Sequence, residues 1–378
     1  MRTLLQITFA ISVSASLFAQ APGLSLPPSG NNQKASVSQF IGPVQITIDY
    51  SSPAVHGPNG VDRRGQIWGK LVPYGMTDLG FDGGKPSPWR GGANENTVFT
   101  VSDPVMIEGQ ALAAGKYGLH FIPGADEWTV VFSKDSDAWG SFFYNESHDA
   151  LRVKVKPAKH EYREWLTYEF PVRRPSEATA EMQWEELAVP WQIKVENVDE
   201  LYYTKIQQQL TSAFGFNLPY YDAAAQFCVR QGIHLDQALN WADLAISMPF
   251  IGQANFDTLS TKALVLSKMG RDAEADKIMQ TAIHHPSATA VQIHQYGRQL
   301  LTAGKKQEAL EVFKLNAERN GEAWPTNVGL ARGYMAVGDY QKALEYARKA
   351  AAQAPDNQNK QNLEAMVRSL EDGKPYAN

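Results

Sequence analysis

Residues 304–309 read Gly-Lys-Lys-Gln-Glu-Ala. A glycine followed five residues later by an alanine also occurs at 270–275 and at 338–343, so the pattern returns twice at an interval of 34 residues. Glycine adopts the left-handed conformation that ends many helices, and alanine is small enough to let a second helix approach closely. Because the interval is constant, the spacing predicts helical hairpins stacked into an α-solenoid in the C-terminal half.

A weaker copy of this pattern comes earlier, at Gly232 and Ala238. Together the copies resemble the tetratricopeptide repeat, a family with the same period. Prolines stand near the expected ends of the second helices, at Pro249, Pro286 and Pro355. The resemblance implies about four helix pairs and a polar capping helix over 359–372. It also implies a concave groove, lined by the first helix of each pair, that binds peptides or other proteins.

The composition changes near residue 198. Residues 21–198 contain seven of the nine tryptophans, whereas residues 199–378 contain 28 alanines against 14 in the first half. Aromatic residues suit strands and alanine suits helices. We therefore expect a β-domain over 35–198 and a repeat domain over 199–378, with a linker at 21–34 before them.

Short alternating stretches fill the first half, and turn residues separate them. In the stretch 44–50, Val44, Ile46 and Ile48 fall on one face. Further strands are expected at 97–101, 116–122, 127–133, 151–155, 164–170 and 189–195. Short strands without intervening helices predict an antiparallel β-sandwich, jelly-roll-like in its arrangement. No alternation of strand and helix is visible, which argues against a nucleotide-binding Rossmann unit.

The long connection between 51 and 96 is too rich in tryptophan, arginine and glycine to read as disordered. Its motifs are Trp-Gly-Lys-Leu-Val-Pro-Tyr-Gly at 68–75 and Trp-Arg-Gly-Gly-Ala-Asn-Glu-Asn-Thr at 89–97. With further motifs at 115–123 and 127–133, they resemble a bacterial exported family, domain-of-unknown-function family 2911. The resemblance covers about 35–196, although the stretch 76–88 is longer than the family pattern. It implies no particular activity.

Polar residues of this half could converge into a pocket. His120 falls on the face opposite the core on its strand, and Arg152 is expected to point outward on another. The candidate ligand-binding residues are Trp89, Arg90, Asn94, Glu95, His120, Trp139, Asp149 and Arg152. Glu95 and His120 could act as acid and base, and an arginine could orient a carboxylate or phosphate. The structural alternative is that Arg90 pairs with Glu95 to fix the turn, and that His120 is a surface histidine.

Other chemistry has weaker support. The eight histidines are scattered, so neither a metal site nor a cofactor is expected. The single cysteine, Cys228, excludes an intramolecular disulfide and suggests a core position on a helix. The formal net charge of −5 argues against a nucleic-acid partner. In the repeats, His294, Arg298 and Arg332 are the residues expected to face the groove, unless the repeats only complete the structure of the β-domain.

The first twenty residues have the order of a secretory signal peptide. Arg2 precedes an apolar stretch, and small residues follow at 19–21. The stretch is shorter than a membrane span, and no later segment approaches that length. We therefore expect an exported protein, periplasmic or extracellular. The leading interpretation is a binding protein that holds proteins or peptides through its repeats and a small molecule or glycan in its β-domain. The alternative is an envelope hydrolase, possibly carbohydrate-directed, that uses Glu95 and His120.

Overall fold

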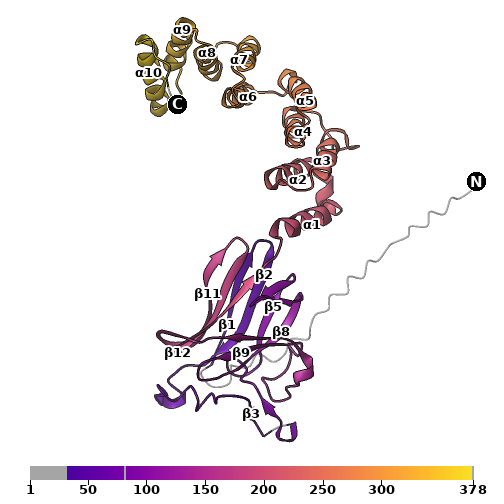
Figure 1. Ribbon diagram of the computed structural model, residues 1–378, viewed down its shortest axis with the longest axis vertical. Coiled ribbons are helices and arrows are strands. Elements are labelled where there is room, and N and C mark those ends of the chain that lie inside the picture. Colours follow the sequence, from indigo (N-terminus) through magenta and orange to yellow (C-terminus); the bar gives the residue numbers. More distant parts are fainter. Residues whose placement is uncertain (1–31, 81, 377–378) are drawn as a thin grey trace, which may run out of the picture. The chain divides into compact units, whose positions relative to one another are not determined.

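The computed structural model describes residues 32–80 and 82–376 (Figure 1). The expected signal peptide at 1–20 and most of the expected linker lie outside these residues. The chain forms two compact units that divide between Tyr202 and Tyr203. This division lies within α1 (Val198–Leu210), the helix that begins where the composition changes.

The first unit contains two antiparallel sheets. The larger has the strand order β1-β2-β5-β8-β9-β10 and the smaller the order β11-β12-β6-β7. The strands of the larger sheet are β1 (Gln33–Ile41), β2 (Val44–Ser52), β5 (Thr97–Val101), β8 (Gly115–Ile122), β9 (Trp128–Ser133) and β10 (Asp149–Val155). Those of the smaller sheet are β11 (Ala158–Arg174), β12 (Glu177–Lys194), β6 (Val105–Ile107) and β7 (Gln110–Leu112). A separate short ribbon pairs β3 (Thr77–Asp78) with β4 (Pro86–Ser87) within the stretch that departs from the family pattern.

One hydrophobic core joins the inward faces of both sheets. Tyr117, Leu119 and Phe121 enter it from β8, as their alternation predicts. Trp128, Trp184 and Trp191 are among its largest fully buried side chains. The expected β-sandwich is therefore confirmed, with two packed sheets and no closed barrel in the described part of the unit.

The sequence underestimated some strands. β1 was not expected, because most of its side chains are exposed or half-buried and the hydrophobic alternation is weak. β11 is also longer than predicted, since both its ends carry charged residues, whereas the unpredicted part of β12 contributes Ala178, Ala180, Met182 and Trp184 to the core. Strands at the edge or beyond the core need little burial, so hydrophobic patterning does not detect them.

The second unit consists of paired helices. The first helices are α2 (Leu218–Gln231), α4 (Phe256–Lys268), α6 (Ala290–Thr302) and α8 (Trp324–Ala336). The second helices are α3 (Leu235–Ser247), α5 (Asp272–His284), α7 (Lys306–Asn320) and α9 (Tyr340–Ala352), and α10 (Asn357–Glu371) follows as the expected capping helix. Within this unit the first helices lie along the inner side of the curve and the second helices along the outer side (Figure 1).

The glycines and alanines of the repeat have the predicted roles. Each repeat glycine has a positive φ after the first helix of its pair: Gly232, Gly270, Gly304 and Gly338. Each repeat alanine is buried near the start of the second helix: Ala238, Ala275, Ala309 and Ala343. The α-solenoid is therefore confirmed. None of the helices in the described residues has the length and apolar character needed to cross a membrane.

Candidate functional site

The motif at 89–97 leaves the larger sheet and returns to it. Trp89 and Phe121 exchange two backbone hydrogen bonds of 2.8 Å, and Thr97 pairs with Leu119. Leu119 and Phe121 are two residues apart on β8, whereas their partners Thr97 and Trp89 are eight residues apart. Residues 90–96 therefore form an excursion beside the one residue of β8 between those positions, His120.

Two glycines let this excursion lie close to the sandwich. Gly91 has a φ of +66°, and a Cβ there would lie 2.6 Å from the Tyr168 hydroxyl oxygen. That hydroxyl donates a hydrogen bond of 2.7 Å to the Gly91 carbonyl. A Cβ on Gly92 would lie 2.9 Å from the carbonyl oxygen of Ser51. The glycines of the Trp-Arg-Gly-Gly motif thus serve close packing and a hydrogen bond.

Arg90 holds the excursion through the backbone. Its guanidinium donates to the Asn94 carbonyl and lies 4.7 Å from the centre of the Phe142 ring. Glu95 instead forms an ion pair of 3.0 Å with Lys34 and accepts a hydrogen bond from Ser51. The expected pairing of Arg90 with Glu95 is therefore wrong: the turn is fixed by a carbonyl, and the Glu95 carboxylate is held by side chains of β1 and β2.

His120 lies on the outer face of its strand, as predicted, but it is only 2% exposed. Its Nδ1 lies 2.9 Å from the Ser141 hydroxyl, and its ring contacts Tyr144 edge-on at 5.7 Å. Burial lowers the pKa of His120 to about 4, and the nearby Arg90 contributes in the same direction. The expectation of a surface histidine is wrong, because the segment 134–148 covers this face.

A second polar group lies in the same row of the sheet. His120 and Arg152 both pair with Val131 of β9, from opposite sides. Arg152 binds Asp149 at 2.6 Å and the Tyr144 hydroxyl at 2.6 Å, and that hydroxyl also donates to Asp149. The Tyr144 ring thus connects this group to His120.

Five of the eight predicted residues therefore divide into two smaller groups. Arg90 and Asn94 share a hydrogen bond, His120 lies near Arg90, and Asp149 pairs with Arg152. Glu95 pairs elsewhere, and Trp139 is 53% exposed. The sequence missed Ser141 and Tyr144, which lie in the same covering segment as the predicted Trp139 but in no alternating stretch. Asp149 is paired with Arg152 through one oxygen, and burial favours the neutral form of His120, which suits a structural role.

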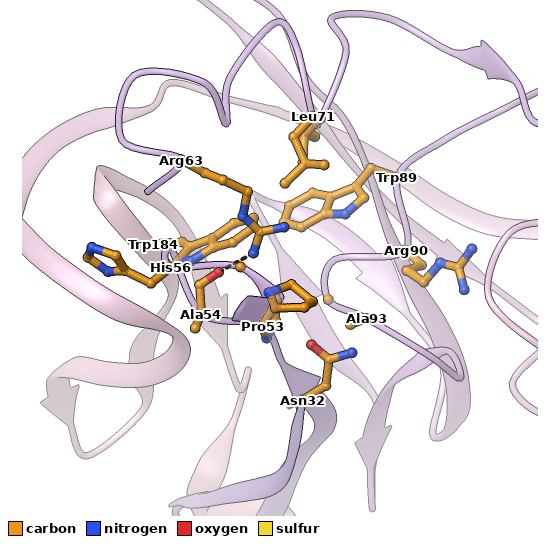
Figure 2. Close-up of a pocket in the computed structure, with 14 residues that line it drawn as sticks. Asn32, Pro53, Ala54, His56, Arg63, Leu71, Trp89, Arg90, Ala93 and Trp184 are labelled. Atoms are coloured by element: carbon orange, nitrogen blue, oxygen red, sulfur yellow. Dashed lines mark hydrogen bonds between the residues drawn. The ribbon is translucent and has the colours of Figure 1, made fainter. Parts of the chain in front are cut away.

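A cavity of about 340 Å³ lies on the other side of the excursion (Figure 2). The sequence predicted Trp89 and Arg90 for this site. It missed the remaining lining, which includes Pro53, Ala54, His56, Arg63, Leu71 and Trp184. Figure 2 shows the guanidinium of Arg90 pointing away from the cavity, whereas Arg63 reaches into it. Arg63 donates a hydrogen bond of 2.6 Å to the Ala54 carbonyl.

Tryptophans from both long motifs meet beside the cavity. Trp89 stacks on Trp184 with a centroid distance of 6.2 Å and an angle of 14°. Trp68 contacts both rings edge-on, at 5.8 Å and 5.7 Å. The indole nitrogens of Trp68 and Trp184 are buried without a hydrogen-bond partner. The motifs at 68–75 and 89–97 therefore build one aromatic wall.

A further group of polar side chains lies near His56. Its Nδ1 is 2.9 Å from Glu164, which also accepts a hydrogen bond from the Tyr162 hydroxyl. Figure 2 shows the His56 ring turned away from the cavity. Across residues 32–80 and 82–376, no group of three or more histidine, cysteine, aspartate or glutamate side chains is arranged to hold a metal ion.

In the repeats, the three predicted groove residues lie near one another. His294 and Arg298 belong to α6 and Arg332 to α8, and both arginines contribute to lowering the pKa of His294. Burial is the main cause of that shift, to about 4. α6 and α8 thus bring the three side chains near one another, and the His294 ring also lies 5.6 Å from the Phe313 ring of α7.

Comparison with known proteins agrees with both resemblances. Residues 32–193 match the model of a family described as "Protein of unknown function (DUF2911)", and residues 326–357 match the tetratricopeptide repeat. The two matches confirm both resemblances, in the order along the chain that the sequence predicts. No curated protein matches the sequence.

Several solved structures are similar to part of the chain. YrrB, titled a TPR protein with an unusual peptide-binding site, is 21% identical over 44% of this chain and 84% of its own, with a TM-score of 0.30. The C-terminal part of a TPR repeat-containing protein from Cytophaga hutchinsonii is 15% identical over 46% and 70%, with a TM-score of 0.35. A tetratricopeptide repeat protein from Parabacteroides merdae is 15% identical over 46% and 66%, with a TM-score of 0.33.

Proposed function

We propose that this chain, which joins a domain matching the family of unknown function DUF2911 to tetratricopeptide repeats, is an exported binding protein. Its repeats hold a peptide or protein segment on the concave face, the surface formed by α2, α4, α6 and α8. Stacked helix pairs commonly use this surface for binding, because it is extended and belongs to consecutive repeats.

The observation that carries the proposal is the exposure of apolar side chains on these helices. Leu264 of α4 is 51% exposed and Val291 of α6 is 53% exposed. Neither is needed for the cores between the helices, which are filled by other residues. Exposed apolar side chains among polar ones are typical of recognition surfaces.

A display library of random peptides, selected against the full chain, tests this binding. We expect enriched peptides to bind in fluorescence polarisation and to lose at least about tenfold in affinity on Leu264→Asp or Val291→Asp. Val337→Asp is a matched control, since Val337 is also exposed but lies after the end of α8. Failure to enrich any peptide, or equal loss in the control, would contradict the proposal.

Export rests on the order of residues 1–20 and is tested separately. Fusing 1–20 to a reporter enzyme that is active only outside the cytoplasm should give activity, and replacing Arg2 and the apolar stretch with polar residues should remove it. Activity that survives this replacement would show that the segment is not the export signal.

A second candidate function belongs to the β-domain. The cavity combines the Trp89 ring, the half-exposed Leu71 side chain and the Arg63 guanidinium, which suits a small molecule or glycan with a flat apolar face. A thermal-shift screen with glycans and small aromatic acids tests it. The expected stabilisation should be lost in Leu71→Ala and retained in Val172→Ala, because Val172 is similarly exposed but does not line the cavity. The hydrolase alternative is not favoured, because Glu95 binds Lys34 and Ser51 whereas His120 lies against Ser141.

A further inference from the structure

Two turns at one end of the hairpin formed by α2 and α3 expose aromatic side chains. The short helix Ala213–Phe216, which comes just before α2, exposes Phe214 and Phe216, the latter to 81%. Tyr220 in the first turn of α2 is also exposed, and its ring contacts the Phe214 ring edge-on at 5.4 Å. In the turn after α3, the Phe250 side chain is fully exposed.

The two turns adjoin because α2 and α3 form a hairpin. Only residues 232–234 connect the two helices, so the start of α2 lies beside the end of α3. Tyr221 at the start of α2 belongs to a buried cluster, and Met248 and Ile251, which flank Phe250 in the sequence, pack against this cluster. The exposed aromatic side chains therefore lie at one end of the hairpin. We call them the aromatic end: Phe214, Phe216, Tyr220 and Phe250.

The turn after α3 holds the Phe250 ring outward at a conformational cost. Phe250 has a φ of +70°, which a bulky residue seldom adopts. Two backbone hydrogen bonds close the turn: the Gly252 N–H donates to the Met248 carbonyl at 2.7 Å, and the Gln253 N–H donates to the Ala245 carbonyl at 2.9 Å. Strained conformations that the surrounding structure enforces are concentrated at functional sites. The outward position of this ring therefore calls for a functional explanation.

Neither turn contains a charged residue. No aspartate, glutamate, lysine, arginine or histidine occurs over 206–221 or 244–256. The charged residues that border these two stretches are one base and three acids: Lys205, Asp222, Asp243 and Asp257. Both turns can therefore leave water without removing a charge from it, which is the costly step in entering an apolar phase.

We propose that the aromatic end inserts into a lipid surface and holds the chain at a membrane as a peripheral protein. Its side chains project outward from turns, so they suit a soft apolar phase that needs no matching shape. Three of the four are phenylalanine, whereas the energetic centres of protein interfaces are enriched in tryptophan, tyrosine and arginine. Because basic residues are lacking in both turns, the contact is apolar insertion and not attraction to anionic headgroups.

Co-sedimentation of the full chain with phosphatidylcholine vesicles tests this contact. We expect binding that is equal at low and high salt, because salt does not screen apolar insertion. Phe216→Ser and Phe250→Ser should each weaken binding about tenfold, since each removes one buried aromatic ring. Phe40→Ser is the matched control and should leave binding unchanged, because Phe40 is similarly exposed but belongs to β1 of the other unit.

A polarity-sensitive fluorophore tests insertion directly. Cys228 is buried, so Phe250→Cys adds one accessible thiol for labelling. The label at position 250 should become brighter and shift to shorter wavelength when phosphatidylcholine vesicles are added, whereas a label on Phe40→Cys should not. Absence of binding to these vesicles, or an unchanged label at position 250, would overturn the proposal.

Two other outcomes would assign the aromatic end differently. Binding only to phosphatidylglycerol vesicles, lost at high salt, would show that basic residues elsewhere make the membrane contact. A dimer in sedimentation velocity that Phe216→Ser abolishes, without vesicle binding, would show that a second copy of the chain covers the aromatic end. Either result overturns the lipid contact. Neither affects the proposed peptide binding, which is measured with separate ligands and with variants of Leu264 and Val291.

Discussion

Gly91 and Gly109 occupy similar backbone conformations for different reasons. Both have a positive φ, but a Cβ on Gly91 would overlap Tyr168 and Phe121, whereas a Cβ on Gly109 would meet no atom within 4 Å. Replacing either by alanine costs about 1 kcal/mol for the backbone conformation. Gly91→Ala also forces apart packed atoms, so its free energy of unfolding should fall by at least about 2 kcal/mol more. Urea unfolding followed by tryptophan fluorescence measures both, and equal losses would contradict the packing role.

His120 should make the stability of the first unit depend on pH. Its pKa is about 4 when folded, against about 6.5 in an unfolded chain. Between these values the unfolded chain binds more protons, so stability rises with pH. The free energy of unfolding should therefore be unaffected by this group above about pH 6.5 and fall by up to about 3 kcal/mol as pH decreases toward 4.

His120→Gln isolates this contribution, because glutamine can still bond to Ser141 but does not titrate. We expect the variant to lose the decrease between pH 6.5 and 4, measured by urea unfolding at a series of pH values. His160→Gln, on β11 and outside this cluster, should keep the decrease. Parallel pH profiles for His120→Gln and the unchanged protein would show that other groups produce it.

At the scale of elements, the segment 134–148 is held on the sheet by a few polar contacts. The Tyr144 hydroxyl bonds to Asp149 and Arg152, and removing it in Tyr144→Phe leaves both partly unsatisfied. The loss should be about 1–3 kcal/mol. Amide hydrogen exchange should become faster in 134–148 and stay unchanged in β5, since local opening follows the lost contacts. Faster exchange throughout the sheet would mean that the hydroxyl supports the whole sandwich.

The sequence predicted elements better than it predicted contacts. Alternation located β8 and the outward face of His120, because side chains on a strand alternate strictly. The constant interval located the repeat glycines and alanines, because each has a steric role that few residues can fill. What covers His120 could not be predicted, since 134–148 has no alternation or constant spacing that would fix its path over the sheet. The partner of Arg90 was predicted wrongly for a related reason: it is a backbone carbonyl, and every residue has one, so the sequence does not single it out.

Across the whole molecule, the hydrophobic clusters separate along the chain. The β-sandwich core includes residues up to Leu201, and the clusters of the helical unit begin at Tyr203. Within the helical unit, Phe313 of α7 lies against Gly297 and Gly329, where a Cβ would come as close as 2.3 Å and 2.5 Å to its ring. Each unit therefore has its own packed interior, and residues of α1 contribute to both.

We therefore expect two separable unfolding transitions in the full chain. Phe313→Ala should destabilise the helical unit by about 3–5 kcal/mol through the cavity that it leaves, and Gly91→Ala should destabilise only the β-sandwich. Calorimetry of the unchanged chain and both variants tests this, with circular dichroism at helix wavelengths assigning the transition that moves. Because the division falls inside α1, fragments should end after that helix for the β-unit and begin before it for the repeats. A single transition that moves as a whole in both variants would show that the two units unfold as one.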